Sequence, residues 1–230
     1  MPVINTNISA TLTANALTKN ERAMSQSMER LSTGLRINSA ADDAAGLAIS
    51  SKMTSQINGL NQAVRNANDA ISMIQTADGA YIEIGNMLQR MRELEVQAAN
   101  GTNSTTDVTN LDVEYTALGN AIDAIVTNTE WNGGNILDGT AAAAVFTIGA
   151  NAENVTVAFG DGDAAGGALA LATVAIATGT LTTIDNAIAA VNSQRATFGA
   201  AINRLEYTVD NLTNASQNQS ASRSRIQDAD

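Results

Sequence analysis

One apolar pattern near the end of this 230-residue chain limits its fold more than any other feature. From residue 184 to residue 212 the pattern advances in alternating steps of four and three, and Arg195 is its one charged member. This alternation is the seam of a left-handed coiled coil. A helix with so narrow an apolar stripe is not stable alone, so the pattern predicts a long helix packed lengthwise on others. Its seam positions are Ile184, Ile188, Val191, Arg195, Phe198, Ile202, Leu205, Val209 and Leu212.

Two earlier stretches repeat the spacing and predict the partner helices. The first contains a slip near Asp78 and Gly79, which is expected to change the supercoil locally. Its seam runs through Ile57, Leu60, Val64, Ala67, Ile71 and Ile74, then through Tyr81, Ile84, Leu88 and Met91. The second runs through Leu111, Tyr115, Leu118, Ile122, Ile125 and Thr129.

A turn at residues 100–103 joins these two helices and should fold them antiparallel. Gly101 is expected in the left-handed conformation that ends a helix, and Thr105 or Thr106 is expected to cap the next one. Farther along, the alternating runs Val145–Ile148 and Val155–Phe159 predict a β-hairpin. The predicted fold class is therefore mainly α, an antiparallel long-helix coiled-coil bundle forming a rod, with a small β-hairpin insert.

The composition excludes several classes of function. The chain has no His and no Cys, which removes zinc sites, thiolate nucleophiles and Ser-His-Asp triads, and we expect no enzyme and no cofactor. Its net charge of −11, with only twelve Lys and Arg, argues against nucleic acid as a partner. Two aspartates in residues 160–167 lack the remaining ligands of a calcium loop, so we favour a solvated loop there.

The first forty residues carry another amphipathic helical stripe, which Gly34 and the alanines near residues 40–45 should interrupt. Its charges are mixed, with Lys19 and Arg22 beside Glu21, unlike a basic helix that lies on membranes. No run approaches the length of a membrane span, so we expect no membrane insertion and favour partner helices. The stripe comprises Ile4, Ile8, Leu12, Leu17, Met24, Met28, Leu31 and Leu35.

Several long motifs, in order, resemble bacterial flagellin. The first two are the opening Met-Pro-Val-Ile-Asn-Thr-Asn of residues 1–7 and the run 29–49, which begins Glu-Arg-Leu-Ser-Thr-Gly-Leu-Arg-Ile-Asn. The next two are Asp-Ala-Ile-Ser-Met-Ile-Gln-Thr-Ala-Asp-Gly of 69–79 and Leu-Gln-Arg-Met-Arg-Glu-Leu of 88–94. The last two are Thr-Glu-Trp-Asn-Gly of 129–133 and the final run 221–230. The resemblance implies a secreted structural subunit that polymerises into the extracellular flagellar filament for swimming. It also implies export by the flagellar type III apparatus and contacts with other flagellin subunits and with cap and hook-junction proteins.

The resemblance also implies a domain plan. Residues 1–42 would form a helical segment of the inner tube, residues 43–138 and 181–230 the surrounding layer of long helices, and residues 139–180 a short variable region. By family analogy, the hydroxyl side chains of residues 139–183, all of them Thr, are candidate O-glycan carriers. Flagellins usually continue past the position of Asp230 with a helix that pairs with the N-terminal one. Without that partner, residues 1–42 are expected to be ordered only by other chains, or to be mobile.

In flagellins recognised by Toll-like receptor 5, the contact lies on the outer face of the long helix and the returning helix. The matching positions here are Gln89, Arg90, Leu94, Gln97 and Glu114. Arg90 could form bidentate hydrogen bonds, and an exposed Leu94 would be an apolar anchor. The same residues could instead pack on neighbouring subunits or form a solvated face. Alternatives for the whole chain are a hook–filament junction protein and a membrane-active amphipathic helical protein.

Overall fold

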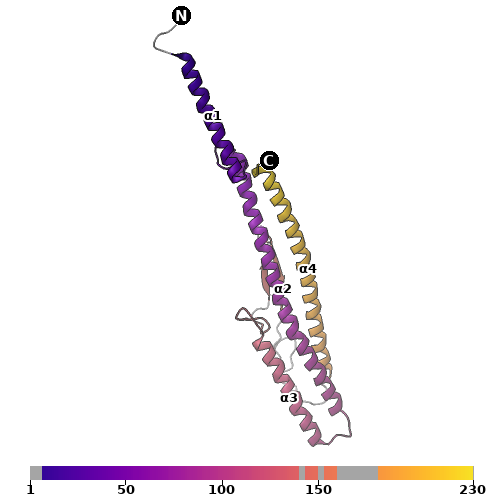
Figure 1. Ribbon diagram of the computed structural model, residues 1–230. Helices are drawn as coiled ribbons and strands as arrows, with labels where there is room; N and C mark the ends of the chain where they lie inside the picture. Colours follow the sequence, from indigo (N-terminus) through magenta and orange to yellow (C-terminus); the bar gives the residue numbers. More distant parts are fainter. Residues whose placement is uncertain (1–6, 140–142, 150–152, 160–180, 230) are drawn as a thin grey trace. The chain divides into compact units, whose positions relative to one another are not determined.

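The computed structural model describes residues 7–139, 143–149, 153–159 and 181–229 (Figure 1). It confirms a mainly α fold of long helices with a small antiparallel hairpin. The chain divides into two compact units, here called unit 1 (residues 1–59 and 214–230) and unit 2 (residues 60–213). The helices are α1 (Ile8–Thr33), α2 (Ala44–Ala98), α3 (Thr105–Asn128) and α4 (Leu181–Gln227), and the strands are β1 (Glu130–Trp131), β2 (Gly134–Asn135), β3 (Ala144–Thr147) and β4 (Asn154–Val157).

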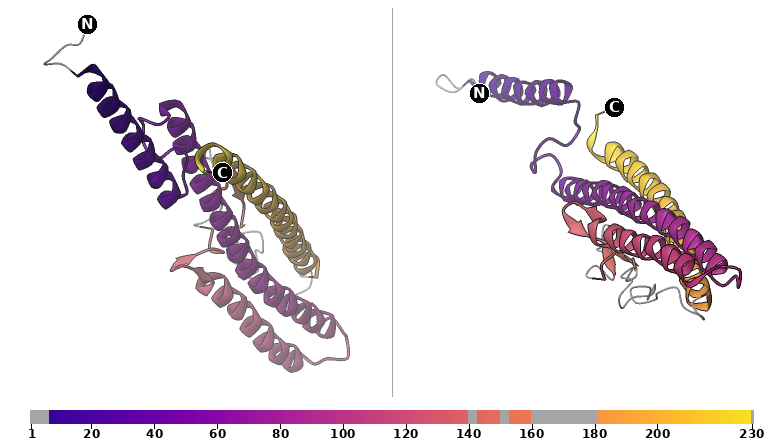
Figure 2. Two further views of the ribbon diagram at one scale, coloured as in Figure 1. Left: turned by 45° about the horizontal axis from the view of Figure 1, so that its top comes forward. Right: turned by 90° about the horizontal axis from the view of Figure 1, so that it is seen from below.

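In unit 2 the three helices α2, α3 and α4 pack lengthwise, and α3 folds back beside α2 (Figure 2). Two ion pairs fix the direction of α4: Arg92 pairs with Asp185, whereas the earlier Asp78 pairs with the later Arg195. Because the order is reversed, α2 and α4 are antiparallel. This is the arrangement that the seam patterns predict.

The core of unit 2 combines small side chains on α2 with larger ones from α2, α3, α4 and the hairpin region. Ala67, Ala70 and Ala77 are fully buried, which lets neighbouring backbones come close. The larger buried side chains include Ile74, Ile84, Leu88 and Met91 of α2, Tyr115, Ile122 and Val126 of α3, Val155, Val157 and Phe159 of the hairpin region, and Ile184, Val191, Phe198 and Leu205 of α4.

Half of the Tyr and Phe residues of the chain meet in one aromatic cluster. The ring of Phe198 lies 5.6 Å from that of Tyr81, edge-on, and 5.6 Å from that of Phe159. The Tyr81 hydroxyl also donates a 3.1 Å hydrogen bond to the backbone carbonyl of Phe159. The cluster therefore joins α2, α4 and the segment after β4.

The slip in the α2 pattern coincides with the charged seam position of α4. Helix α2 continues without interruption through Asp78 and Gly79. Arg195 Nε donates to Asp78 Oδ1 at 2.8 Å, and the side chains of Arg195 and Asp78 are 40% and 30% exposed. The polar pair thus lies where the spacing of apolar residues on α2 changes, and it fixes the register of α2 against α4.

Two antiparallel hairpins accompany the helices. The expected one is β3–β4, paired from Ala144 with Val157 to Thr147 with Asn154, and it is held on α2 by the Asn66 side chain, which donates to the Thr147 carbonyl. The pair β1–β2 was not expected. Its turn is Asn132-Gly133, with φ of 51° and 78°, the combination that favours this dipeptide in tight hairpins.

The turn between α2 and α3 differs from the expectation in two details. Ser104, not Thr105 or Thr106, caps α3, and it forms a capping box with Asp107. Gly101 does not take a positive φ. The solvated loop expected at residues 160–167, and most of the variable region, lie outside the described residues.

Unit 1 joins α1 and the start of α2 to the end of α4. Helix α1 begins at the cap Asn7 and ends at Gly34, whose φ is 70°, which confirms the expected break. The segment after Gly34 then pairs with the end of α4: Arg36 N donates to the Gln227 carbonyl at 2.7 Å, and Ala229 N donates to the Gly34 carbonyl at 2.9 Å. Ile37 is buried against Gly46, where an added Cβ would lie only 2.5 Å from its Cδ1.

Candidate interaction surface

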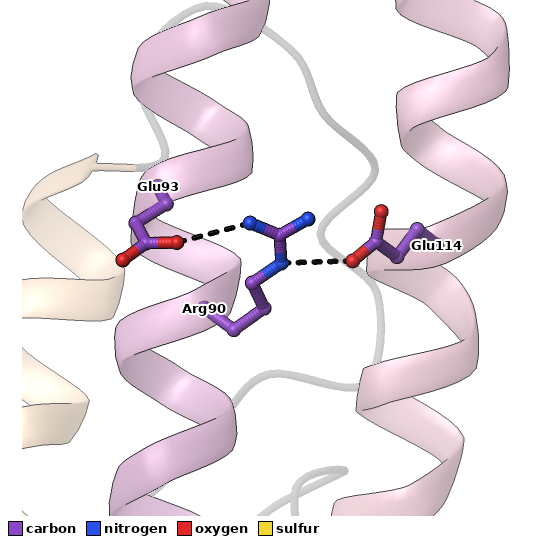
Figure 3. A network of polar contacts seen from close by, with 3 residues as sticks. All are labelled: Arg90, Glu93 and Glu114. Carbon is purple, nitrogen blue, oxygen red and sulfur yellow. Dashed lines mark hydrogen bonds and ion pairs between the residues drawn. The ribbon is translucent and has the colours of Figure 1, made fainter.

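The most organised polar cluster on the expected receptor face centres on Arg90. Its Nε donates to Glu114 Oε1 at 2.8 Å, and its Nη1 donates to Glu93 Oε2 at 3.0 Å (Figure 3). The hydrogen bonds that Arg90 donates to Glu114 and to Glu93, together with the negative charges of these carboxylates, raise the pKa of Arg90. The Arg90 side chain is 48% exposed, so the guanidinium is both positioned and accessible.

The structure brings together Arg90 and Glu114 of the expected contact residues, from α2 and α3. Gln89 and Gln97 are exposed on α2. Leu94, however, is fully buried, so the expectation that it forms an exposed apolar anchor is wrong. The reason is that α2 packs on both α3 and α4 in this region, which makes its buried stripe wider than a two-helix seam.

Two polar features at or beneath this surface were not predicted from the sequence. Glu93 holds Arg90 from its other side, and the Arg–Glu spacing of three residues on one helix would have revealed it. Glu95 is only 5% exposed, and its Oε2 has no hydrogen-bond partner among the described residues; the same holds for the buried Tyr115 hydroxyl. Burial, reinforced by the negative charges of Glu95 and Asp112, raises the pKa of Tyr115 to about 12.

The expected seam residues lie mostly inside the bundle. Buried members of the set are Ile57, Leu60, Ile74, Leu88, Ile122, Val191, Phe198 and Leu205. Partly buried members are Val64, Ile71, Leu118, Ile188, Ile202 and Val209. The apolar stripe of α1 behaves differently, because α1 has no buried residue. Its Ile8, Leu12, Leu17, Met24, Met28 and Leu31 are 61–83% exposed.

The part of the chain that the structure describes offers neither a metal site nor a membrane span. There, no three acidic side chains gather closely enough to hold a metal ion. None of the described helices combines the length and hydropathy needed to cross a bilayer.

Comparisons with known proteins agree with this architecture. The sequence profile of the "Bacterial flagellin N-terminal helical region" matches residues 4–142, and that of the "Bacterial flagellin C-terminal helical region" matches residues 181–230. The chain is 44% identical to a flagellin of Bacillus subtilis, and 41% identical to the flagellar filament 33 kDa core protein of Treponema phagedenis. Each alignment covers 99% of this chain and 87% of the relative.

A crystal structure of Bacillus cereus flagellin superposes with a TM-score of 0.55 at 36% identity, covering 69% of this chain and 94% of that one. Long helices with lengthwise seams, a small hairpin and two matching profiles thus lead to one conclusion. The chain belongs to the bacterial flagellin family and is a structural subunit of the extracellular flagellar filament.

Proposed function

We propose that this subunit enters the filament by covering the exposed stripe of α1 with helices of other chains. The observation that carries the proposal is that α1 exposes six large apolar side chains and buries none. Fully burying one such side chain is worth about 1.5–3 kcal/mol, so the stripe offers a large driving force for association. In this assembly residues 1–42 form the inner tube, residues 43–138 and 181–230 form the layer around it, and residues 139–180 face outward.

The assembly test uses substitutions within the stripe. The double variant Leu12→Ser and Met24→Ser should raise the critical concentration for polymerisation, measured by sedimentation, at least about tenfold. Its monomer should unfold at the wild-type temperature, because both residues are exposed in the single chain. The matched control is Asn15→Ser, which alters a polar side chain on the same helix. Unchanged assembly of the double variant would refute the proposal.

We also propose that the monomer is recognised by Toll-like receptor 5 through Gln89, Arg90, Gln97 and Glu114. A guanidinium has five N–H donors, and the two ion pairs engage two of them, so Arg90 keeps donors for a partner. Its position is held by carboxylates from both α2 and α3, which lowers the entropic cost of ordering it on binding. Leu94 has no part in this contact, because it is buried.

Receptor binding of the monomer separates this role from a solvated surface. Arg90→Ala should weaken binding at least tenfold, whereas Arg90→Lys should be intermediate because Lys lacks the planar fork. Arg92→Ala is the matched control, since Arg92 is 45% exposed on the same helix but pairs with Asp185 of α4. Equal binding by wild type and Arg90→Ala would contradict the proposal.

We further propose export in an unfolded state by the flagellar type III apparatus, followed by contacts with cap and hook-junction proteins. The chain has no Cys and only one Trp, three Tyr and three Phe, which suits threading through a narrow channel. A disulfide-closed loop inserted within residues 139–180 should therefore block secretion from living cells. Normal secretion of that variant in its oxidised form would refute the proposal.

A further inference from the structure

The charge of this chain is divided unevenly between its two units. Unit 1 has seven Lys and Arg against six Asp and Glu, a net charge of +1, whereas unit 2 has five against seventeen, a net charge of −12; together these give the −11 of the chain. A subunit with this division attracts a second copy when unit 1 of one faces unit 2 of the other.

Within unit 1, several carboxylates already have neutral partners. Asp42 accepts hydrogen bonds from the Gln26 side chain at 2.8 Å and from the backbone N–H of Ser39 at 2.9 Å. Glu29 accepts from the Asn38 amide, and Asp228 accepts from the Ser224 hydroxyl. Among the described residues, none of these carboxylates forms an ion pair with an arginine of the same unit.

Three arginines of unit 1 line two adjoining depressions, which we call the arginine groove. Arg30 and Arg36 line the first, of about 500 Å³. Arg36 and Arg225 line the second, of about 470 Å³, together with Asp228, so two arginines face one carboxylate there. Among the described residues none of the three forms an ion pair, in contrast to Arg90, Arg92 and Arg195 of unit 2.

The donors of the groove are partly fixed and partly unused. Arg36 Nη2 donates to the Ile226 carbonyl at 2.6 Å, which orients its guanidinium. Arg30 Nε is buried and has no hydrogen-bond partner in the described part of the chain. A guanidinium that forms no ion pair keeps other N–H donors for a ligand, and a carboxylate is the acceptor that matches it best.

We propose that the arginine groove of one subunit binds a carboxylate on unit 2 of a second copy, as a charged contact between subunits of the filament. This rests on the proposed polymerisation and adds to it a site and its ligand class. Unit 2 offers exposed carboxylates that have no partner among the described residues: Asp69, Glu83, Glu130, Glu153, Glu206 and Asp210. An anionic lipid surface is the less favoured occupant, because unit 2 with its net −12 would be repelled by it.

The first test measures polymerisation. The contact is heterologous, so each added subunit contributes one such contact. Arg30→Gln with Arg36→Gln should therefore raise the critical concentration about three- to tenfold at low salt, and the ratio to wild type should approach one in about 1 M NaCl as the charges are screened.

The control for net charge is Arg204→Gln, an exposed arginine of unit 2, which should leave the critical concentration unchanged. An equal effect of Arg204→Gln, or no effect of the groove variant, would overturn the proposal. So would a groove variant that assembles normally but no longer sediments with phosphatidylglycerol vesicles. Normal assembly of the Leu12→Ser, Met24→Ser variant would instead count against the proposed function, so the two failures are distinguishable.

The second test keeps the arginines and does not depend on the stability of a variant lacking them. The chain has no Cys, so Ser27→Cys, on the exposed wall of the groove, can carry a single maleimide-benzophenone label. Filaments of mixed ¹⁴N and ¹⁵N subunits are irradiated and analysed by mass spectrometry. Crosslinks that join a ¹⁴N subunit to an acidic peptide from residues 60–213 of a ¹⁵N subunit, or the reverse, support the proposal. Crosslinks confined to one chain, or to unit 1 of another copy, overturn it.

Discussion

Phe198→Ala is the substitution that tests most directly how unit 2 is held together. Phe198 is 1% exposed and touches both Tyr81 and Phe159, so its removal leaves a cavity among α2, α4 and the segment after β4. Truncation of a buried Phe costs about 3–5 kcal/mol, which includes the cavity. Domains of this kind have about 5–15 kcal/mol in total, so the expected loss is a third of the stability or more.

Urea unfolding of the monomer measures this loss of stability. Fluorescence of the single Trp is the probe, because Trp131 packs on the same core. With a urea slope near 2 kcal/mol per molar, the transition should move down by about 1.5–2.5 M. Phe198→Leu is the matched control and should lose less than about 1.5 kcal/mol. A loss below about 1 kcal/mol for Phe198→Ala would show that the three rings do not support the unit.

Three smaller effects should also be measurable. A double-mutant cycle on Arg195→Met and Asp78→Asn should give a coupling of about 0.5–1 kcal/mol in urea unfolding; zero coupling would contradict a register-fixing pair. Ser104→Ala should cost about 1 kcal/mol by the same assay, since it removes the α3 cap.

The carboxyl of Asp42 has its pKa lowered to about 2, chiefly by the Gln26 amide. The ionised form therefore favours folding above the unfolded value of 3.8 and loses this effect as the pH falls toward 2. Gln26→Ala should raise that pKa in an NMR titration, and an unchanged value would refute the cause.

The sequence predicts the helices and their faces well, because a long apolar period is a local property that packing reinforces. The α4 seam shows this, since Val191, Phe198 and Leu205 are all buried. The prediction for Leu94 failed because burial there depends on a third helix. The seam spacing of α2, continued past Met91, places Glu95 in the seam four residues later. Contact with the third helix widens the buried stripe, so Leu94, one residue before Glu95, is buried as well.

Polar details were harder to predict, because they depend on which helices meet. Nothing local indicates that Asp78 would face Arg195, or that Arg90 would bind a carboxylate of α3. The β1–β2 hairpin could have been predicted from its Asn132-Gly133 turn. The cap at Ser104 could have been predicted from its three-residue spacing to Asp107.

The bare surface of α1 has a thermodynamic consequence for the polymer that we propose. Apolar area that stays hydrated in the single chain and becomes dry in the polymer gives association a negative heat-capacity change. Attraction of this origin weakens as water cools. Growth of the polymer should therefore have a curved dependence on temperature, with cold favouring free subunits, even though no residue of α1 is buried in the single chain.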